Sequence, residues 1–358
     1  MLIPSKRDQV GRQTPDGRCT LAWFSKGDWV HPVETTKQLA YVERRGALTV
    51  FELASGALVK ELRRTHVIVS HVDEQLWLQT SRGYERIEPG SLEAVEGVTL
   101  PAARWEGKTL LWGVHDAFRS GFVYRSAEDR KFRFSNAHPD YLAAVEFDSG
   151  DTKYLLELPA AGNVEDLWTN DRLLLCSVRR EDERVLMVFS RRKGETLQVA
   201  KPARGRVRVV VWGKHTLAEL GERWHRWDDA QRRLRPAVGI AKGASLQVLG
   251  RELLAHHPRG LQRLEFDGTR FVPRARQARL KNSCAAFRVG RSLGCFVSTA
   301  GTYGPYSLAW LDPGDLRELG RSELEVSGEL RVTVAGRHVL LETDDGLAAL
   351  RIGGARGA

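Results

Sequence analysis

The sequence predicts an all-β protein built from a repeated unit of about four short strands. A short hairpin phrase recurs seven times along the chain. Apolar runs of about four to eight residues have the length and spacing of half-buried strands. No apolar stripe of helical period is sustained, so helices are expected to be scarce.

The hairpin phrase consists of an apolar strand end, a turn rich in Asp, Glu or Gly, and the start of the next strand. Its seven copies are Phe51–Leu58, Arg86–Leu92, Glu146–Leu155, Phe189–Leu197, Arg226–Leu234, Glu265–Val272 and Trp310–Leu316. The turn glycines, with Ala230 in their place in the fifth copy, are 34 to 60 residues apart. A unit that recurs at such intervals is typical of solenoids, propellers and arrays.

Further strand candidates lie between successive phrases. Ahead of the fourth copy, for example, Leu173–Val178 and Val185–Phe189 combine alternation with short apolar runs. Each unit therefore holds about four short strands, which matches the ~40–50-residue, four-stranded blade of a β-propeller.

The two ends of the chain predict how the repeat is closed. Three strand candidates follow the seventh phrase, at Leu330–Val334, His338–Glu342 and Leu347–Ile352, and they leave the last unit one strand short. Thr20–Phe24 is a strand candidate without a hairpin phrase of its own. Pairing it with the last unit closes the ring and removes an exposed sheet edge. Eight blades are the preferred number, and seven is the alternative if one irregular unit is not a separate blade.

The chain thus resembles the β-propeller superfold over nearly its whole length, in the degenerate style of WD40-like and PQQ-like repeats. Trp227-Asp228 is the one Trp-Asp pair at the relevant place, and no unit has the Gly-His partner of true WD40 repeats. The resemblance implies a single closed propeller over residues 19–358. The polar residues 1–18 are expected to form a flexible tail ahead of it.

Composition narrows the class of protein. No run approaches 18 uninterrupted apolar residues, and the N-terminus lacks the apolar core of a signal peptide, so a cytoplasmic protein without membrane attachment is expected. Cys19, Cys176, Cys284 and Cys295 show no metal-ligand spacing and are expected to be reduced core thiols. No metal site and no cofactor is predicted.

Positive charge is concentrated in one stretch of the chain. The net charge is +10, yet residues 179–281 alone hold 25 Lys and Arg against 11 Asp and Glu, a balance of +14. The candidate nucleic-acid contacts there are Arg204, Arg206, Arg208, Arg274, Arg276, Arg279 and Lys281. Because the charges at 204–208 alternate with Gly and Val, they are predicted to share one strand face. A phosphate-tracking surface has this pattern, and so does a solvated propeller rim.

The third unit contains an insertion, at about residues 113–142, that the other units lack. Its aromatic side chains stand among arginines, a mixture that is typical of interface anchors. The candidate partner contacts are Phe118, Phe122, Tyr124, Phe132, Phe134 and Tyr141. The alternative is that these aromatic residues pack a longer blade.

A second candidate partner contact is the loop Ser298–Tyr306 in the seventh unit. It is rich in Gly and Pro and is expected to expose Tyr303 and Tyr306, which suits recognition. A long hairpin turn has the same composition and is the alternative.

Catalytic signatures are nearly absent. Gly290–Gly294 matches G-x-S-x-G around Ser292, but a strand is predicted after it, whereas a nucleophile elbow leads into a helix. No phosphate-binding loop, zinc-protease motif or calcium loop occurs. The pair His256-His257 is predicted to point to opposite faces of a strand.

The sequence therefore predicts a non-catalytic scaffold that binds protein partners within a multi-subunit complex of bacterial type. Plain propellers occur, for example, in systems that pair a MoxR-type ATPase with a vWA-domain protein, which is an analogy of fold only. The alternatives are a nucleic-acid-binding subunit that uses residues 179–281 and an enzyme with a site at the channel mouth.

Overall fold

The computed structural model describes most of the chain, in two compact units. The described residues are 2–27, 34–36, 38–44, 47–63, 69–72, 75–80, 83–88, 91, 93–101, 110–112, 120–125, 141–146, 152–157, 163–170, 172–205, 207–298, 305–326, 330–343 and 345–353. Unit 1 comprises Met1–Arg64 and Val238–Ala358, and unit 2 comprises Thr65–Ala237.

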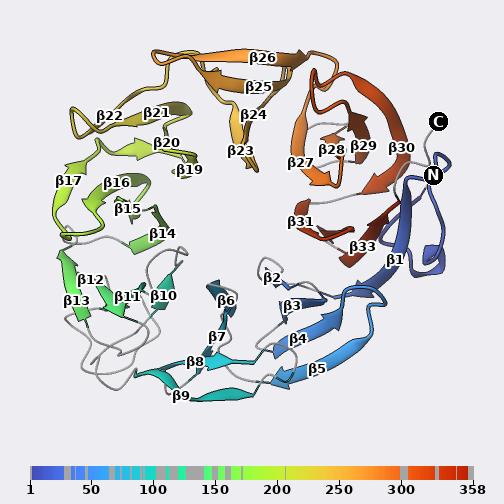
Figure 1. Ribbon diagram of the computed structural model, residues 1–358, viewed down its shortest axis with the longest axis horizontal. Helices are drawn as coiled ribbons and strands as arrows, with labels where there is room; N and C mark the ends of the chain where they lie inside the picture. Colours follow the sequence, from blue (N-terminus) through green and yellow to red (C-terminus); the bar gives the residue numbers. More distant parts are fainter. Residues whose placement is uncertain are drawn as a thin grey trace. The chain divides into compact units, whose positions relative to one another are not determined.

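Unit 1 combines both ends of the chain. Its strands are β1 (Cys19–Lys26), β2 (Glu34–Thr35), β3 (Leu39–Arg44), β4 (Ala47–Glu52), β5 (Leu58–Arg63), β23 (Ser245–Leu249), β24 (Glu252–His257), β25 (Gly260–Phe266), β26 (Phe271–Gln277), β27 (Ser283–Val289), β28 (Ser292–Ser298), β29 (Tyr306–Leu311), β30 (Glu318–Val326), β31 (Arg331–Ala335), β32 (His338–Thr343) and β33 (Gly346–Ile352). They form sheets in the orders β2-β3-β4-β5, β23-β24-β25-β26, β27-β28-β29-β30 and β1-β33-β32-β31 (Figure 1).

Unit 2 is a continuous stretch of chain. Its strands are β6 (Val69–Val72), β7 (Gln75–Thr80), β8 (Gly83–Ile87), β9 (Ala94–Pro101), β10 (Leu110–Trp112), β11 (Ser120–Arg125), β12 (Tyr141–Glu146), β13 (Thr152–Glu157), β14 (Asn163–Thr169), β15 (Leu173–Arg180), β16 (Glu183–Ser190), β17 (Thr196–Val199), β18 (Ala203–Arg204), β19 (Arg208–Trp212), β20 (His215–Leu220), β21 (Arg223–Asp228) and β22 (Arg233–Pro236). They form four further sheets, each of four consecutive strands, and β18 adds to the edge of β16.

The protein is therefore all-β, with four-stranded antiparallel sheets throughout the described residues. A single 3-10 turn, η1 (Arg7–Gln9), is the one helical element in that part of the chain. No described helix is long and apolar enough to cross a membrane.

Each of the seven hairpin phrases connects the third strand of a sheet to the fourth. The sixth copy, for example, joins β25 to β26, and the Asp267 carboxylate accepts backbone N–H bonds from Thr269 and Arg270, both at 2.9 Å. Because these bonds favour the charged form, they lower the pKa of Asp267 to about 2. The recurring acidic residue thus fixes the turn by local hydrogen bonding.

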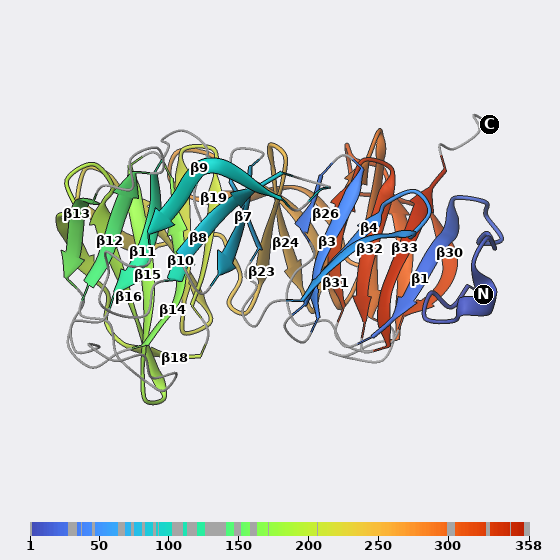
Figure 2. The same ribbon diagram turned by 90° about the horizontal axis from the view of Figure 1, so that it is seen from below.

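The eighth sheet has no hairpin phrase because its fourth strand comes from the other end of the chain. β1 pairs antiparallel with β33, from Cys19 opposite Ile352 to Lys26 opposite Gly346. The predicted pairing of Thr20–Phe24 with the last unit is thus present, and Figure 2 shows β1, β33 and β32 side by side.

Central strands are buried on both faces, whereas the last strand of a sheet is exposed. β24 and β28 are almost wholly buried along their length, while β22 and β26 expose most of their polar side chains. Within unit 1, the first strand of one sheet lies beside the first strand of the next, in the order β23, β27, β31 and β2. This double burial explains why alternation is mixed with continuous apolar runs in the sequence.

The N-terminal residues are packed, where the sequence predicts a flexible tail over 1–18. Leu2 is 2% exposed, belongs to a core cluster with Leu324 and Val326, and forms a parallel bridge with Leu324 of β30. The N-terminal segment runs beside β30 in Figure 2. The apolar residues Leu2 and Ile3 ahead of the polar stretch are the cause, because Leu2 fills a place in the core.

The four cysteines are free thiols, and three of them are buried as predicted. Cys284 is the exception, since it is exposed. The pairing of β27 with β28 shifts register between Ser283 and Ala285, and this bulge turns the intervening side chain out of the core.

Candidate binding surfaces

The aromatic insertion of the third unit lies mostly outside the described residues. Phe118, Phe132 and Phe134 fall there, as does Tyr303 of the second loop. Phe122 and Tyr124 are on β11, where the backbone pairs with Ala144 and Leu142 of β12, and Tyr141 begins β12. The insertion therefore includes a regular strand of its sheet, and its role as a partner contact stays a prediction.

Tyr306 corrects the expectation of an exposed side chain in the second loop. It begins β29 and is 4% exposed, within the same core cluster as Leu308 and Trp310. These three residues alternate along β29 and so point to one face of the sheet. Tyr306 is a core residue, and it provides no contact surface for a partner.

The arginines at 204–208 do not share one strand face, which corrects a second expectation. Arg204 ends β18, which pairs with β16, whereas Arg208 begins β19 of the following sheet. Gly205 between them has a φ of 90° and breaks the strand. Arg204 is exposed, Arg208 forms an ion pair with Glu219 (Nε–Oε2 3.4 Å), and Arg206 lies outside the described residues.

The remaining predicted cations line the exposed edge of one sheet in unit 1. Arg274 and Arg276 are on β26, and Arg279 and Lys281 follow it on the way to β27; all four are exposed. Arg274 forms an ion pair with Glu265, which lowers the pKa of that carboxyl. Arg276, Arg279 and Lys281 form no ion pair within the described part of the chain. We call these three residues the β26 cation cluster.

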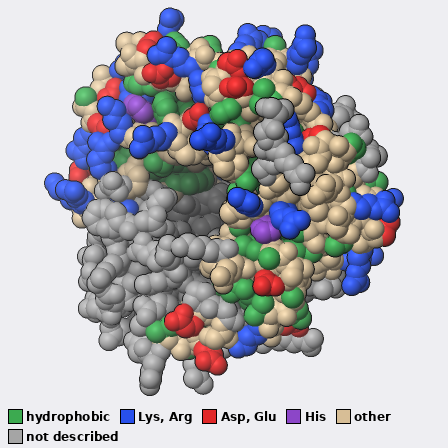
Figure 3. Space-filling view, turned by 45° about the vertical axis from the view of Figure 1, so that its right-hand side comes forward, with side chains coloured by type: hydrophobic (Ala, Val, Ile, Leu, Met, Phe, Trp, Pro, Cys, Tyr) green, Lys and Arg blue, Asp and Glu red, His purple; other side chains and the backbone are tan. Residues whose placement is uncertain are grey.

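Carboxylates pair with several of the arginines in and next to the basic stretch of residues 179–281. Ion pairs join Arg172 to Asp229, Arg208 to Glu219, Arg232 to Glu195, Arg235 to Asp228, Arg263 to Glu252, Arg270 to Asp267 and Arg274 to Glu265. On the face drawn in Figure 3, acidic side chains likewise lie among basic ones. Within each unit, a phosphate near one of these pairs would meet negative charge as well, because each carboxylate neutralises its partner arginine and repels an anion.

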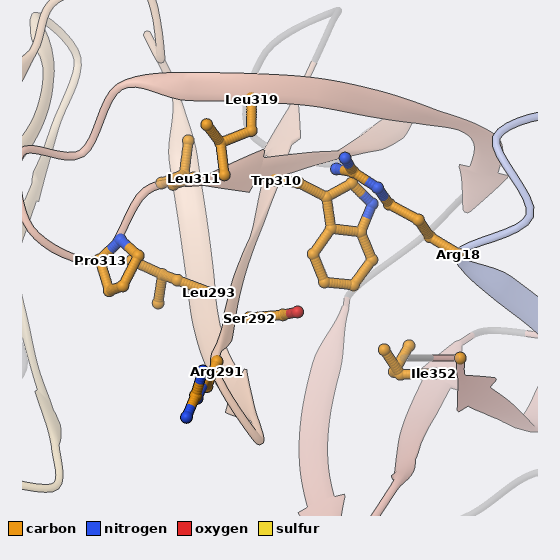
Figure 4. A pocket seen from close by; sticks show the side chains of 10 residues that line it. Arg18, Arg291, Ser292, Leu293, Trp310, Leu311, Pro313, Leu319 and Ile352 are labelled. Carbon is orange, nitrogen blue, oxygen red and sulfur yellow. The ribbon is translucent and has the colours of Figure 1, made fainter. Parts of the chain in front are cut away.

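A pocket of about 100 Å³ lies in unit 1, where the N-terminal segment meets two sheets. Its apolar walls are Leu293, Trp310, Leu311, Pro313, Leu319 and Ile352. Arg18, Arg291 and Ser292 add polar groups, with Arg18 against the indole of Trp310 and Arg291 at the opposite end (Figure 4). Leu319 is 49% exposed and forms part of the rim, whereas Trp310 is 2% exposed.

A hydrogen-bond chain holds Arg18 and Trp310 in place. The Trp310 indole N–H donates to Ser322 Oγ (2.6 Å), and the Ser322 hydroxyl donates to Asp16 Oδ2 (2.8 Å). Asp16 also lies 3.9 Å from Nε of Arg18, whose guanidinium carbon is 5.8 Å from the centre of the Trp310 ring. Arg18 thus has a cation–π contact and a nearby counter-charge, so its orientation is fixed from two sides.

Sequence reasoning missed this pocket because its residues come from distant segments. Arg18 precedes β1, Arg291 and Ser292 sit in the β27–β28 hairpin, and Trp310 is on β29. The signal nearest to it was the G-x-S-x-G string. The structure confirms that this string is a hairpin turn, with a φ of 59° at Gly290 and a strand that starts at Ser292.

His256 and Ser283 form a buried pair that resembles a base and a nucleophile. His256 Nδ1 is 3.0 Å from Ser283 Oγ, and Nε2 is 3.0 Å from Gln247 Oε1. Gln247 Oε1 also accepts the Ala286 N–H (2.9 Å), so Nε2 carries the proton and Nδ1 accepts the Ser283 hydroxyl. His256 is 4% and Ser283 8% exposed, so both side chains are buried, and the network ties β23 and β24 to β27.

The described residues contain no group of three or more His, Cys, Asp or Glu side chains placed to hold a metal ion. No protein-family model matches the chain, and no curated protein does.

Solved structures match the chain over most of its length. It is similar to the computationally designed Ika8 protein, with a TM-score of 0.62 and 10% identity over 92% of this chain and 98% of that one. It is also similar to dihydro-heme d1 dehydrogenase NirN in complex with DHE, with a TM-score of 0.54 and 14% identity over 84% of this chain and 67% of that one. At these identities the likeness concerns the fold alone. With the repeated four-stranded antiparallel sheets, it indicates a propeller-like all-β fold and assigns the chain to no family.

Proposed function

We propose that this protein is a non-catalytic scaffold that docks protein partners, built as a single closed propeller of eight four-stranded blades. Seven copies of one hairpin connection and the completion of the last sheet by β1 support this architecture. A rigid body with double-sided burial of its central strands suits a scaffold, because it presents loops and outer strands at fixed positions.

The observation that carries the choice of partner is the pairing of arginines with carboxylates in seven ion pairs in and next to the basic stretch. A protein surface of mixed charge complements such a pattern, whereas a nucleic-acid backbone meets repulsion at each carboxylate. The β26 cation cluster is the proposed contact for an acidic patch of the partner. The aromatic residues of the insertion, from Phe118 to Tyr141, are the second proposed contact.

The alternative function is a nucleic-acid-binding subunit. The β26 cation cluster favours it, since its three exposed cations form no ion pair with any described residue and can contact phosphates. Such binding weakens steeply as salt rises, because phosphate contacts release counterions.

One capture experiment separates the two functions. Tagged full-length protein is used to capture proteins from lysate of the native host, with and without nuclease, and the captured proteins are identified by mass spectrometry. The test variant is R276E/R279E/K281E, and the matched control is K6E/R7E/R12E, which changes three exposed cations of the N-terminal segment.

The scaffold proposal is supported by a protein that is still captured after nuclease treatment and by the control variant, but is not captured by the test variant. Capture that disappears with nuclease, together with salt-sensitive binding of duplex DNA or single-stranded RNA by the unmodified protein, supports the alternative. If no protein depends on the β26 cation cluster, the proposed docking surface is wrong.

A further inference from the structure

We infer that the pocket around Arg18 and Trp310 in unit 1 captures the C-terminal residue of a protein partner, with an apolar side chain and a free carboxylate. This inference rests on the proposed scaffold function and names one chemical feature of the partner. It uses residues that are separate from the β26 cation cluster.

The charge of the pocket selects a monoanion. The positive charge of Arg18 is offset by Asp16, whose Oδ2 lies 3.9 Å from Nε of Arg18. Arg291 at the other end is exposed and has no ion pair within the described residues, so one positive charge is left over. A carboxylate matches that excess, while a phosphate dianion brings one negative charge too many.

The walls of the pocket select an apolar body next to that charge. Trp310, Leu311 and Leu293 are each at most 2% exposed as residues, yet all three contribute surface to the cavity. Leu319, which is 49% exposed, extends this apolar lining to the rim. Covering these groups removes apolar surface from water, and this stabilises a bound apolar side chain.

The size of the pocket selects a single residue. Its volume of about 100 Å³ is well below the ~300–1,000 Å³ of pockets for drug-sized ligands and cofactors. A C-terminal amino acid carries its carboxylate and its side chain on the same Cα, so one residue provides both required groups. An internal acidic segment needs two residues, one for the charge and one for the apolar contact. Capture of C-terminal carboxylates is a recurring mode of peptide recognition.

The test compares three short peptides with the full-length protein. They are acetyl-Ala-Ala-Ala-Leu with a free carboxylate, the same peptide as its C-terminal amide, and acetyl-Ala-Ala-Glu-Leu-amide with an internal carboxylate. Binding is followed by NMR on the indole N–H of Trp310, which is assigned from the spectrum of W310F. We expect the free acid to shift this resonance and the amide to bind at least about tenfold more weakly, as loss of a charge-assisted hydrogen bond implies.

Two variants complete the test. R291Q removes the uncompensated cation and is expected to weaken the binding of the free-acid peptide at least about tenfold. R259Q is the matched control, because Arg259 is an exposed arginine of the β24–β25 turn, outside both the pocket and the β26 cation cluster, and its loss is expected to leave the affinity unchanged. Both positions are exposed, and an otherwise unchanged spectrum verifies that each variant is folded.

The inference is overturned if the free acid at millimolar concentration leaves the Trp310 resonance in place, or if R291Q binds it as tightly as the unmodified protein. It is also overturned if the Glu-Leu amide binds as tightly as the free acid, since the occupant is then an internal segment. Failure here leaves the scaffold proposal standing when R276E/R279E/K281E still abolishes protein capture. Loss of the scaffold proposal is recognised separately, by the absence of any captured protein that depends on the β26 cation cluster.

Discussion

His256 is a histidine that folding keeps neutral. Its imidazole is enclosed between Gln247 and Ser283, and burial lowers its pKa to about 4. In the unfolded chain the same side chain has an ordinary pKa of ~6.5. The cost of charging the ring in the folded state is therefore the cause of a dependence of stability on pH.

The direction of this dependence follows from which state binds the proton. As the pH falls below ~6.5, His256 becomes protonated in the unfolded chain, whereas in the folded protein it stays neutral down to about pH 4. The contribution of His256 to the free energy of unfolding is complete above pH ~6.5. Below that pH it decreases by about 1.4 kcal/mol for each unit that the pH falls, about 3 kcal/mol in all by pH 4. H256Q, which does not titrate, is expected to show a correspondingly flatter profile in urea unfolding between pH 7.5 and 4.5.

H257Q is the matched control, because His257 is the next residue on β24 and points to the opposite, more exposed face. Its profile is expected to follow that of the unmodified protein. If H256Q and the unmodified protein lose stability in parallel as the pH falls, the buried imidazole does not titrate as described.

The pocket shows why single residues were hard to predict as a site. Arg18, Arg291 and Trp310 are unremarkable in sequence, and only the packing of the N-terminal segment on β30 and β33 brings them together. The prediction for Tyr306 was wrong for a local reason. The Gly- and Pro-rich loop composition continues up to the residue where β29 begins, so the sequence does not show that Tyr306 already belongs to the strand. One position along a strand decides whether such a tyrosine is buried or exposed.

At the scale of elements, β1 is the strand on which the last sheet depends. Leu21 is fully buried in the core cluster that also contains Leu350 of β33 and Leu341 of β32. L21A removes apolar contacts and leaves a cavity, and we expect it to lower the free energy of unfolding by about 2–5 kcal/mol. Urea unfolding followed by tryptophan fluorescence measures this change.

The control for that variant is V10A, since Val10 belongs to the same N-terminal region but is 42% exposed. Its effect is expected to stay within about 0.5 kcal/mol. Equal losses for L21A and V10A are incompatible with a core role for β1.

The elements themselves were largely predictable, because turn chemistry is local. Each hairpin phrase contains its own turn residues, as Asp267 illustrates, and each one joins the third and fourth strands of a sheet. The packing of residues 2–18 was not predictable in the same way. A short polar segment with one leucine has no periodicity to detect, and its place is set by the space available beside Leu324.

At the scale of the whole molecule, unit 1 is assembled from two pieces that are far apart in sequence. A circular permutant makes it continuous: a flexible Gly/Ser linker joins the present ends, and the chain opens between Lys242 and Gly243, in an exposed turn ahead of β23. We expect its melting temperature to stay within about 3 °C of that of the parent, because moving a loop changes the closure entropy only slightly.

The matched comparison is deletion of residues 1–26, which removes β1 and exposes the edge of β33. This variant is expected to melt well below the permutant and to aggregate through the exposed edge. Circular dichroism measures the melting temperatures of the two variants, and light scattering measures their aggregation. A deletion variant that melts with the parent shows that β1 is not needed to complete the sheet.

The pairing of β1 with β33 also sets an order of events during synthesis. β1 leaves the ribosome more than 300 residues ahead of its partner β33, which is some tens of seconds at ~5–20 residues per second. Meanwhile the backbone of Gly11, Arg12 and Thr14 is close enough in sequence to bond to Leu21 and Cys19, as it does in the finished protein. This local hairpin shields one edge of the waiting strand. The other edge stays open until β33 has been synthesised, so the nascent chain depends on timing to avoid pairing with a neighbour on the same messenger.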